Sequence, residues 1–310
     1  SPTEMSFGVS IGRGSFEYAG SDNIKALFAQ KRNIFRVRFW KMILEILRFY
    51  KESKNHNFQD SKEITLREYL IRNGYNQSFL RDHILPMTAA IWSTPSAKVG
   101  DFPFTSFLNF CQNHGLLQIK NRPQWFTISG GSQKYVEALA KDTNASFKLQ
   151  TKVEKIIPKN GGVIVRDAKG EEVFFDKILV ATHANTALQM LDQPNSVEKS
   201  ILGAFKYSKN RAVLHSDKNF MPKRKNAWSS WNYIQDNEEN DDALSVTYWM
   251  NKLQHLNTKM PLFLTLNPSN EIEPDLIHYE IEYDHPIFNL KSLESQKKIL
   301  SLMGYRNIWY

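Results

Sequence analysis

The chain has 310 residues, of which 41% are hydrophobic and 23% charged, and 40 Lys and Arg against 32 Asp and Glu give a net charge of +8. This length is enough for about two domains, and the composition excludes a largely disordered chain. The single cysteine, Cys111, excludes an internal disulfide, and no apolar run approaches the ~20 residues of a membrane-spanning helix. The expected location is therefore the cytoplasm, with contact to the cytoplasmic face of a membrane left open.

The basic residues are scattered along the chain and form one small cluster, at 223–225. Nucleic-acid-binding modules concentrate basic and aromatic residues on one surface, so this distribution argues against a nucleic-acid partner. An anionic membrane surface or an acidic small molecule fits the excess charge better. The sequence gives no indication of oligomeric state.

Residues 1–122 are predicted to form the first part of one domain, beginning with a hairpin over residues 4–19. Apolar residues alternate on both sides of Gly12 and Gly14, as expected of two strands around a turn. Helical patterns follow, and the longest covers Val37 to Lys51. It is apolar except for one polar stripe, which favours a core helix over a helix lying on a membrane. The residues of that stripe are Arg38, Lys41, Glu45 and Arg48.

Start and stop signals predict further helices in this block. Ser21 can cap a helix over residues 21–29, and Thr65 with Glu68 forms a capping box. Residues 76–92 are helical in pattern but contain Pro86, which should kink the helix or end its first half. The block is therefore a helical subdomain.

Residues 123–192 are predicted to form a segment of a second domain. Gly130 and Gly131 precede a helix, and strands over residues 153–175 make an antiparallel meander. The apolar run 178–181 then reads as a buried strand that leads into a helix over residues 185–191. Open α/β sheets place nucleotides beyond the ends of such strands, so this is the candidate nucleotide segment.

Residues 193–290 are predicted to return to the first domain. Apolar runs at 211–215, 227–234, 244–250 and 262–266 read as strands of one antiparallel sheet. Residues 291–310 form a helix that leads back to the second domain. The overall fold class expected is α/β with α+β character: a partial Rossmann-like domain interleaved with a domain of antiparallel sheet plus helices.

These residues resemble a known family. The run from Gly130-Gly131-Ser132 through the meander to Ile178-Leu-Val-Ala-Thr-His-Ala184 is similar to the middle of flavin-containing amine oxidases. The likeness is closest to bacterial proteins described as predicted NAD/FAD-binding oxidoreductases of that superfamily. The phrases that suggest this subgroup are EMSFGVS, RPQW, SWNY and VTYWMN.

The resemblance implies an FAD cofactor, with one large departure. No G-x-G-x-x-G motif exists, and Gly12-Arg-Gly14 fits a hairpin turn better than a phosphate loop. In the family that motif opens the protein and a second flavin segment closes it. The chain is therefore expected to be an internal fragment that lacks both.

The resemblance also implies cofactor-binding positions. The valine matching Val153 meets the adenine through its backbone, and the strand matching 178–182 runs beneath the dinucleotide. Gly130 and Gly131 leave room for close approach of a backbone. His183 has two equal interpretations, a donor to the cofactor or a cap of the following helix. The cofactor positions expected are Val153, Gly130, Gly131, Ala181, Thr182 and His183.

Arg211 is the candidate catalytic residue, again by resemblance. It stands where amine oxidases have a lysine that holds a water at the flavin, but a guanidinium cannot act as a base. No histidine or cysteine spacing indicates a metal site. Large aromatic residues are the expected walls of the substrate cavity, although each taken alone is more typical of a core. They are Trp92, Trp125, Trp231, Tyr233, Tyr248 and Trp249.

The expected function is hydride transfer to FAD from a carbon of an apolar small molecule, with a lipid or acyl chain as one such substrate. Two alternatives stay open: an FAD-dependent isomerase, and a non-catalytic binding protein that keeps the fold.

Overall fold

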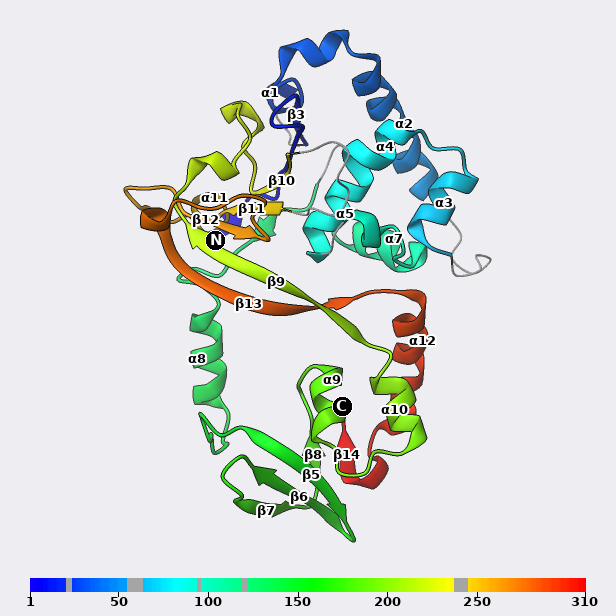
Figure 1. Ribbon diagram of the computed structural model, residues 1–310, viewed down its shortest axis with the longest axis vertical. Helices are drawn as coiled ribbons and strands as arrows, with labels where there is room; N and C mark the ends of the chain where they lie inside the picture. The colour runs from blue at the N-terminus through cyan, green and yellow to red at the C-terminus, as the bar shows by residue number, and fades with distance from the viewer. Residues whose placement is uncertain (21–23, 55–63, 94–95, 119–121, 237–244) are drawn as a thin grey trace. The chain divides into compact units, whose positions relative to one another are not determined.

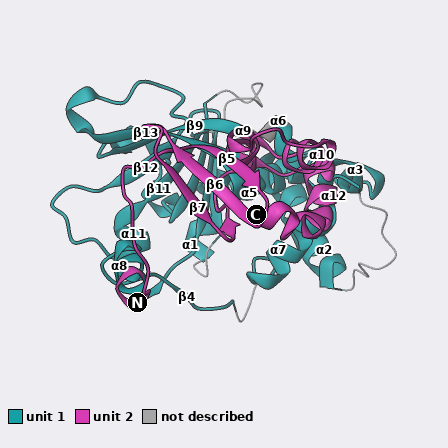
Figure 2. Cartoon of the chain, turned by 90° about the horizontal axis from the view of Figure 1, so that it is seen from below, with its two compact units in different colours: residues 1–139, 208–285 teal, residues 140–207, 286–310 magenta. Residues whose placement is uncertain are grey.

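The computed structural model describes residues 1–20, 24–54, 64–93, 96–118, 122–236 and 245–310. These form two compact units, unit 1 from residues 1–139 and 208–285 and unit 2 from residues 140–207 and 286–310 (Figures 1 and 2). The boundaries fall after residues 139, 207 and 285, whereas those expected from the sequence fell after residues 122, 192 and 290. Residues 193–207 join unit 2 because the helix within them buries Ile201 and Leu202 in its core.

Unit 1 is built on a seven-stranded sheet of order β13-β9-β12-β11-β10-β2-β3. The four strands that the sequence predicted within residues 193–290 are present as β9, β10, β11 and β12, and all belong to this one sheet. A parallel pairing of Trp231 with Phe7 adds the N-terminal hairpin to the sheet, which the sequence did not indicate. The bounds are β2 Phe7–Ile11, β3 Phe16–Gly20, β9 Lys206–His215, β10 Trp231–Gln235, β11 Ser245–Trp249, β12 Phe263–Leu266 and β13 Ile277–Ile287. A short pair, β1 Pro2–Thr3 with β4 Trp125–Phe126, lies outside this sheet.

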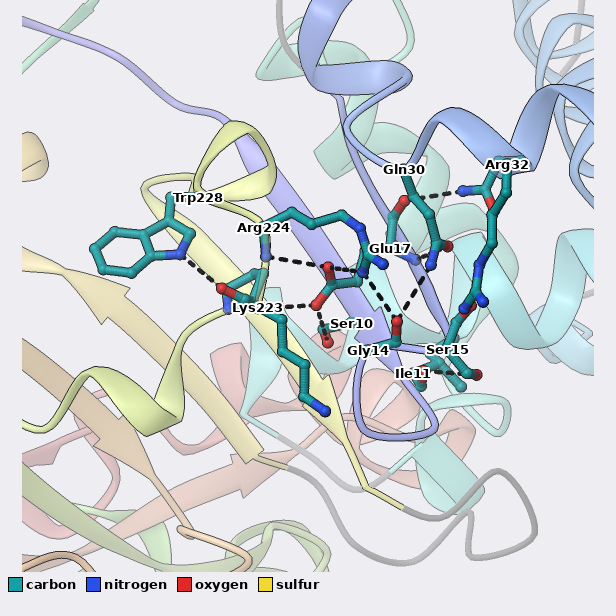
Figure 3. A network of polar contacts seen from close by, with 12 residues as sticks. Ser10, Ile11, Gly14, Ser15, Glu17, Gln30, Arg32, Lys223, Arg224 and Trp228 are labelled. Atoms are coloured by element: carbon teal, nitrogen blue, oxygen red, sulfur yellow. Dashed lines mark hydrogen bonds and ion pairs between the residues drawn. The ribbon is translucent and has the colours of Figure 1, made fainter.

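The hairpin of β2 and β3 confirms the turn expected at Gly12 and Gly14, which both have positive φ. Glu17 on β3 is fully buried and ties the hairpin to the segment at 223–224 (Figure 3). Its carboxylate accepts hydrogen bonds from the Ser10 hydroxyl, the backbone N–H groups of Lys223 and Arg224, and the Arg224 guanidinium at 2.7 Å. The buried charge is therefore neutralised and hydrogen-bonded on both oxygens.

The helical part of unit 1 follows the hairpin. Thr65 and Glu68 form the predicted capping box at the start of α3. The helix expected over 76–92 is divided where Pro86 predicted a break: α4 leads into one π-helical stretch, Leu80–Ile84, before α5 begins. The cap expected at Ser21 lies outside the described residues. The bounds are α1 Ile24–Leu27, α2 Val37–Lys54, α3 Leu66–Arg72, α4 Gln77–Phe79, α5 Leu85–Trp92, α6 Ser96–Val99, α7 Phe104–Asn113, α8 Gln133–Asp142 and α11 Met250–Gln254.

Helix α2 is not the plain core helix that the sequence favoured. One face buries Phe39, Met42 and Phe49, as expected. The opposite face exposes large apolar side chains, including Val37 and Leu44. The expectation was wrong on this point. The apolar pattern shows which sides of a helix can be buried, but it does not show whether another element packs against each side.

Unit 2 contains the predicted meander, β5 Val153–Lys159, β6 Gly162–Asp167 and β7 Glu172–Phe175. The expected buried strand is only two residues long, β8 Ile178–Leu179, and pairs in parallel with β14 Ile308–Trp309. Leu179 is 71% exposed and Ala181 is exposed as well, so the expectation of a buried strand over 178–181 was wrong for these two residues. Among the described residues β8 has a strand on one edge only, and nothing covers the face that carries Leu179.

The helices of unit 2 are α9 Ala184–Met190, α10 Ser196–Leu202 and α12 Leu290–Lys298. Buried Glu198 completes a capping box with Asn195 at the start of α10 and pairs with Arg306 at 2.6 and 2.7 Å. This ion pair joins α10 to the turn before β14. The mixed α/β fold expected from the sequence is confirmed.

Replacing Glu17 tests the network in Figure 3. Glu17→Ala removes a buried carboxylate and leaves four donors without it, so we expect a loss of about 3 kcal/mol in the free energy of unfolding. Urea unfolding followed by circular dichroism measures it. Glu137→Ala is the matched control, because Glu137 pairs with Lys134 on the exposed face of α8 and should change the midpoint little. Equal midpoints for the two variants would contradict a structural role for Glu17.

Candidate functional site

Unit 1 contains a cavity of about 420 Å³, and this cavity is the candidate functional site. It lies among the start of β2, the C-terminal half of α2, the junction of the π-helical stretch with α5, and residues 114–116 and 122–125. Its wall is mixed, because aromatic and thioether side chains lie beside polar ones that include the charged Glu4 and Arg122. Those that matter most for its chemistry are Phe7, Tyr50, His83, Met87, Arg122 and Trp125.

His83 is the most informative residue of this wall, because its protonation can be derived from its neighbours. The Tyr18 hydroxyl donates to the Asp82 carbonyl at 2.7 Å, and the same hydroxyl lies 3.0 Å from Nδ1 of His83. A carbonyl can only accept, so the one phenolic proton goes to Asp82 and Nδ1 of His83 must be the donor to Tyr18. Nε2 is then an unprotonated acceptor.

The remaining nitrogen of His83 has no hydrogen-bond partner among the residues that the structure describes. Its Nε2 is buried, and the imidazole lines the cavity. Burial lowers the pKa of His83 to about 4, so the ring is neutral near pH 7. A buried acceptor without a partner is rare in folded proteins and costs about 1–3 kcal/mol. His83 therefore places an acceptor without a partner next to the cavity, at an atom that solvent does not reach in this structure.

The sequence explains why this arrangement forms. In an α-helix the Asp82 carbonyl would accept from the N–H of residue 86, but Pro86 has none. The Tyr18 hydroxyl takes that place, and the Asp82 carboxylate is held by Arg38 through two contacts of 2.7 Å. Burial raises the pKa of Tyr18 well above its usual value, so its hydroxyl keeps the proton that it donates.

Other polar groups of the cavity are also fixed. Burial raises the pKa of Tyr50 to about 12, so this tyrosine is neutral. The Arg122 side chain donates to the Gln118 carbonyl at 2.8 Å, and Glu4 pairs with Lys252 at 2.9 Å. Nδ1 of His114 lies 2.8 Å from the Phe110 carbonyl, and its ring stacks on Trp125. The polar lining is thus held by main-chain and ionic contacts rather than left loose.

The structure brings only one of the six predicted aromatic residues, Trp125, to this cavity. Trp92 packs on Phe102 and Phe110 in the helical part. Trp231 faces Tyr248 across the sheet with ring centroids 5.5 Å apart. Tyr233 is buried in the sheet, and Trp249 packs on Trp228. Aromatic residue type alone could not distinguish residues that line the cavity from residues of the hydrophobic core. Sequence reasoning missed His83 and Tyr50. For His83 the available signal was its position three residues before Pro86.

Arg211 lies on β9 and forms a bidentate ion pair with Glu280, at 2.6 and 2.8 Å. This contact raises the pKa of Arg211 and lowers that of Glu280. Arg211 does not line the cavity described above. Its role in catalysis stays a prediction.

The predicted cofactor residues fall in two places. Gly130 and Gly131, both with positive φ, form the turn before α8 in unit 1. Val153 begins β5 in unit 2, and residues 181–183 form the exposed turn between β8 and α9. The backbone N–H of Ala184 donates to the Tyr207 hydroxyl at 2.8 Å, and His183 makes no capping bond. His183 thus occupies the N-cap position of α9 without a side-chain capping bond, and its role toward a cofactor stays a prediction.

The residues present fit part of a dinucleotide site. Residues 181–183 and Leu179 are exposed. The His183 ring stacks on Tyr207, and Val153 packs against the core of unit 2. The sequence has no G-x-G-x-x-G loop for a pyrophosphate. Val153, Ala181, Thr182 and His183 would hold the nucleotide end of a flavin. In the described part of the chain, no group of three or more His, Cys, Asp or Glu side chains is arranged to hold a metal ion.

Three solved structures share this fold at low sequence identity. A CLA-producing fatty acid isomerase from P. acnes is 13% identical with a TM-score of 0.58, over 100% of this chain and 75% of that one. A reduced UDP-galactopyranose mutase is 12% identical with a TM-score of 0.60, over 100% and 72%. A putrescine oxidase with bound putrescine is 11% identical with a TM-score of 0.59, over 99% and 75%. At these identities the likeness shows the fold alone.

No curated protein matches the sequence. The family described as flavin containing amine oxidoreductase matches residues 36–251, which include helices α2 to α7 of unit 1, the meander and three strands of the seven-stranded sheet, β9, β10 and β11. This match covers more than half of the chain. The protein therefore belongs to the flavin-containing amine oxidoreductase family.

Proposed function

We propose that the protein is an FAD-dependent oxidoreductase that acts on an apolar small molecule carrying a hydrogen-bond donor. Family membership supports the flavin and the oxidoreductase class. The cavity in unit 1 supports the substrate class, because Phe7, Met87 and Trp125 give its wall an apolar part beside the polar groups. The single observation that supports a hydrogen-bond donor on the substrate is Nε2 of His83, which has no partner among the described residues.

A bound flavin supplies the hydride acceptor, and the protein supplies binding and orientation. His83, fixed as a neutral acceptor, can accept a hydrogen bond from a hydroxyl or amine of the substrate. A fatty alcohol or an amine with an apolar body has this chemistry, and an acyl lipid with a hydroxyl group also fits. A free carboxylate would meet the His83 lone pair and be disfavoured there, although Arg122 offers a positive charge elsewhere in the wall.

The test is anaerobic bleaching of the flavin absorbance of the purified protein by candidate substrates. We expect oxidised-flavin bands that fade on adding an apolar alcohol or amine, with a product two hydrogens lighter. A product of unchanged mass would favour the isomerase alternative, which the fold shared with a fatty acid isomerase and a mutase keeps open. A colourless protein that takes up no added FAD would favour the non-catalytic alternative.

The proposed role of His83 predicts a difference between two matched probes, 1-decanol and its methyl ether. The wild-type protein should bind the alcohol about fivefold more tightly, because only the alcohol has a proton to donate and one net hydrogen bond is worth about 1 kcal/mol. His83→Phe should remove this preference, as measured by titration calorimetry. His278→Gln is the control, since His278 bonds to Ser216 away from the cavity. An unchanged preference in the His83 variant would exclude this residue from binding.

The neutral state of His83 also predicts a pH dependence of stability. Its folded-state pKa of about 4 lies below the unfolded value of 6.5, so between these values the unfolded chain binds the extra proton. Stability from this site is complete above pH 6.5 and falls by about 3 kcal/mol as the pH drops to 4. Urea unfolding at several pH values should show a shallower loss for His83→Gln than for His278→Gln. Parallel curves would show that folding does not lower the pKa of His83.

A further inference from the structure

We propose that the exposed apolar face of α2 and the turn before it bind an anionic lipid surface. This inference does not depend on the proposed reaction. The face consists of side chains that the fold leaves in solvent, although their types are usual for a core. They are Ile34, Phe35, Val37, Trp40, Leu44 and Leu47.

The exposure of this face is large. Phe35 is 88% exposed, Val37 69% and Leu44 64%. Positions 37, 40, 44 and 47 recur at helical spacing, so they form one stripe about 15 Å long on one side of α2. The stripe lies opposite the buried side that carries Met42 and Phe49. Helix α2 therefore has two apolar sides, of which the fold buries one.

Trp40 contributes an apolar ring to this face, because its one polar group is already bonded within the protein. Its indole N–H donates to the Ile34 carbonyl at 2.8 Å, and its ring packs beside Phe28. The donor is therefore satisfied within the protein, and the ring can enter the interfacial region of a bilayer without an unpaired polar group. Tryptophan is enriched at this depth of membranes.

Lysines frame the stripe. Lys31 precedes it, Lys41 lies beside it and Lys51 continues it by one turn. All three are exposed, and none forms an ion pair with a described residue. The acidic residues of the helix, Glu45 and Glu52, both pair with Arg48. An apolar stripe bordered by unpaired lysines is complementary to anionic lipid head groups above acyl chains.

The geometry indicates a surface contact rather than insertion across the bilayer. Within the part of the chain that the structure describes, every helix is too short or too polar to pass through a membrane. Helix α2 also keeps one side packed in unit 1, so it can only lie in the plane of the head groups. Contact there would bring the protein close to apolar molecules dissolved in the bilayer.

Vesicle co-sedimentation tests this proposal with the whole protein. We expect binding to vesicles of phosphatidylcholine with phosphatidylserine, and about tenfold weaker binding to phosphatidylcholine alone or in high salt. The triple variant Phe35→Ser, Val37→Ser, Leu44→Ser should lose at least about tenfold in affinity. Replacing Lys31, Lys41 and Lys51 by Glu should lower the affinity for anionic vesicles about fivefold for each lysine replaced.

Matched controls separate this face from general surface effects. Ile71→Ser changes an apolar side chain of α3 that is 60% exposed, and Lys259→Glu changes an exposed lysine outside the face. Both should bind vesicles as the wild type does. Failure of the wild type to bind anionic vesicles, or equal binding by the triple variant, would overturn the proposal. Loss of a dimer in the triple variant by analytical ultracentrifugation, without any vesicle binding, would assign the face to a second copy instead.

Discussion

The cavity of unit 1 depends on one missing backbone donor. Because Pro86 has no N–H, the Asp82 carbonyl is left to the Tyr18 hydroxyl, and this bond joins strand β3 to the helical part of the unit. The same hydroxyl fixes which nitrogen of His83 carries a proton. The helix break at Pro86 therefore leads to a hydrogen bond between the helical part and the sheet. The same bond fixes Nε2 of His83 as an acceptor.

The proposed reaction and the proposed membrane contact are compatible in their chemistry. Both concern apolar molecules, one through the lining of the cavity and the other through the exposed side of α2. They rest on different residues, since Tyr50 lies on the cavity side of α2 whereas Leu44 and Leu47 lie on the exposed side. A single helix can therefore serve both purposes without conflict between its two faces.

Buried charges stabilise each unit separately. In unit 1 Glu17 joins the N-terminal hairpin to residues more than 200 positions later in the chain. In unit 2 Glu198 caps α10 and pairs with Arg306 near the other end of the sequence. In both cases a carboxylate without exposure is matched by an arginine and by backbone or side-chain donors, the condition under which a buried ion pair is tolerated. These contacts join segments that are far apart in the sequence, and the hydrophobic pattern does not predict that they meet.

Local rules in the sequence were sufficient for elements that depend on near neighbours. The capping box at Thr65, the break at Pro86, the glycine turns and the strands of the meander all depend on residues a few positions apart, and the structure has them. Family membership was also readable, from the glycines and strands around 130–184. Only the tertiary structure decided which apolar residues are buried, because burial of Leu179 or Leu44 requires a partner surface that periodicity does not reveal. For the same reason six aromatic residues looked alike in the sequence while one reached the cavity, and His83 became an acceptor only when Tyr18, 65 positions away, was folded against it.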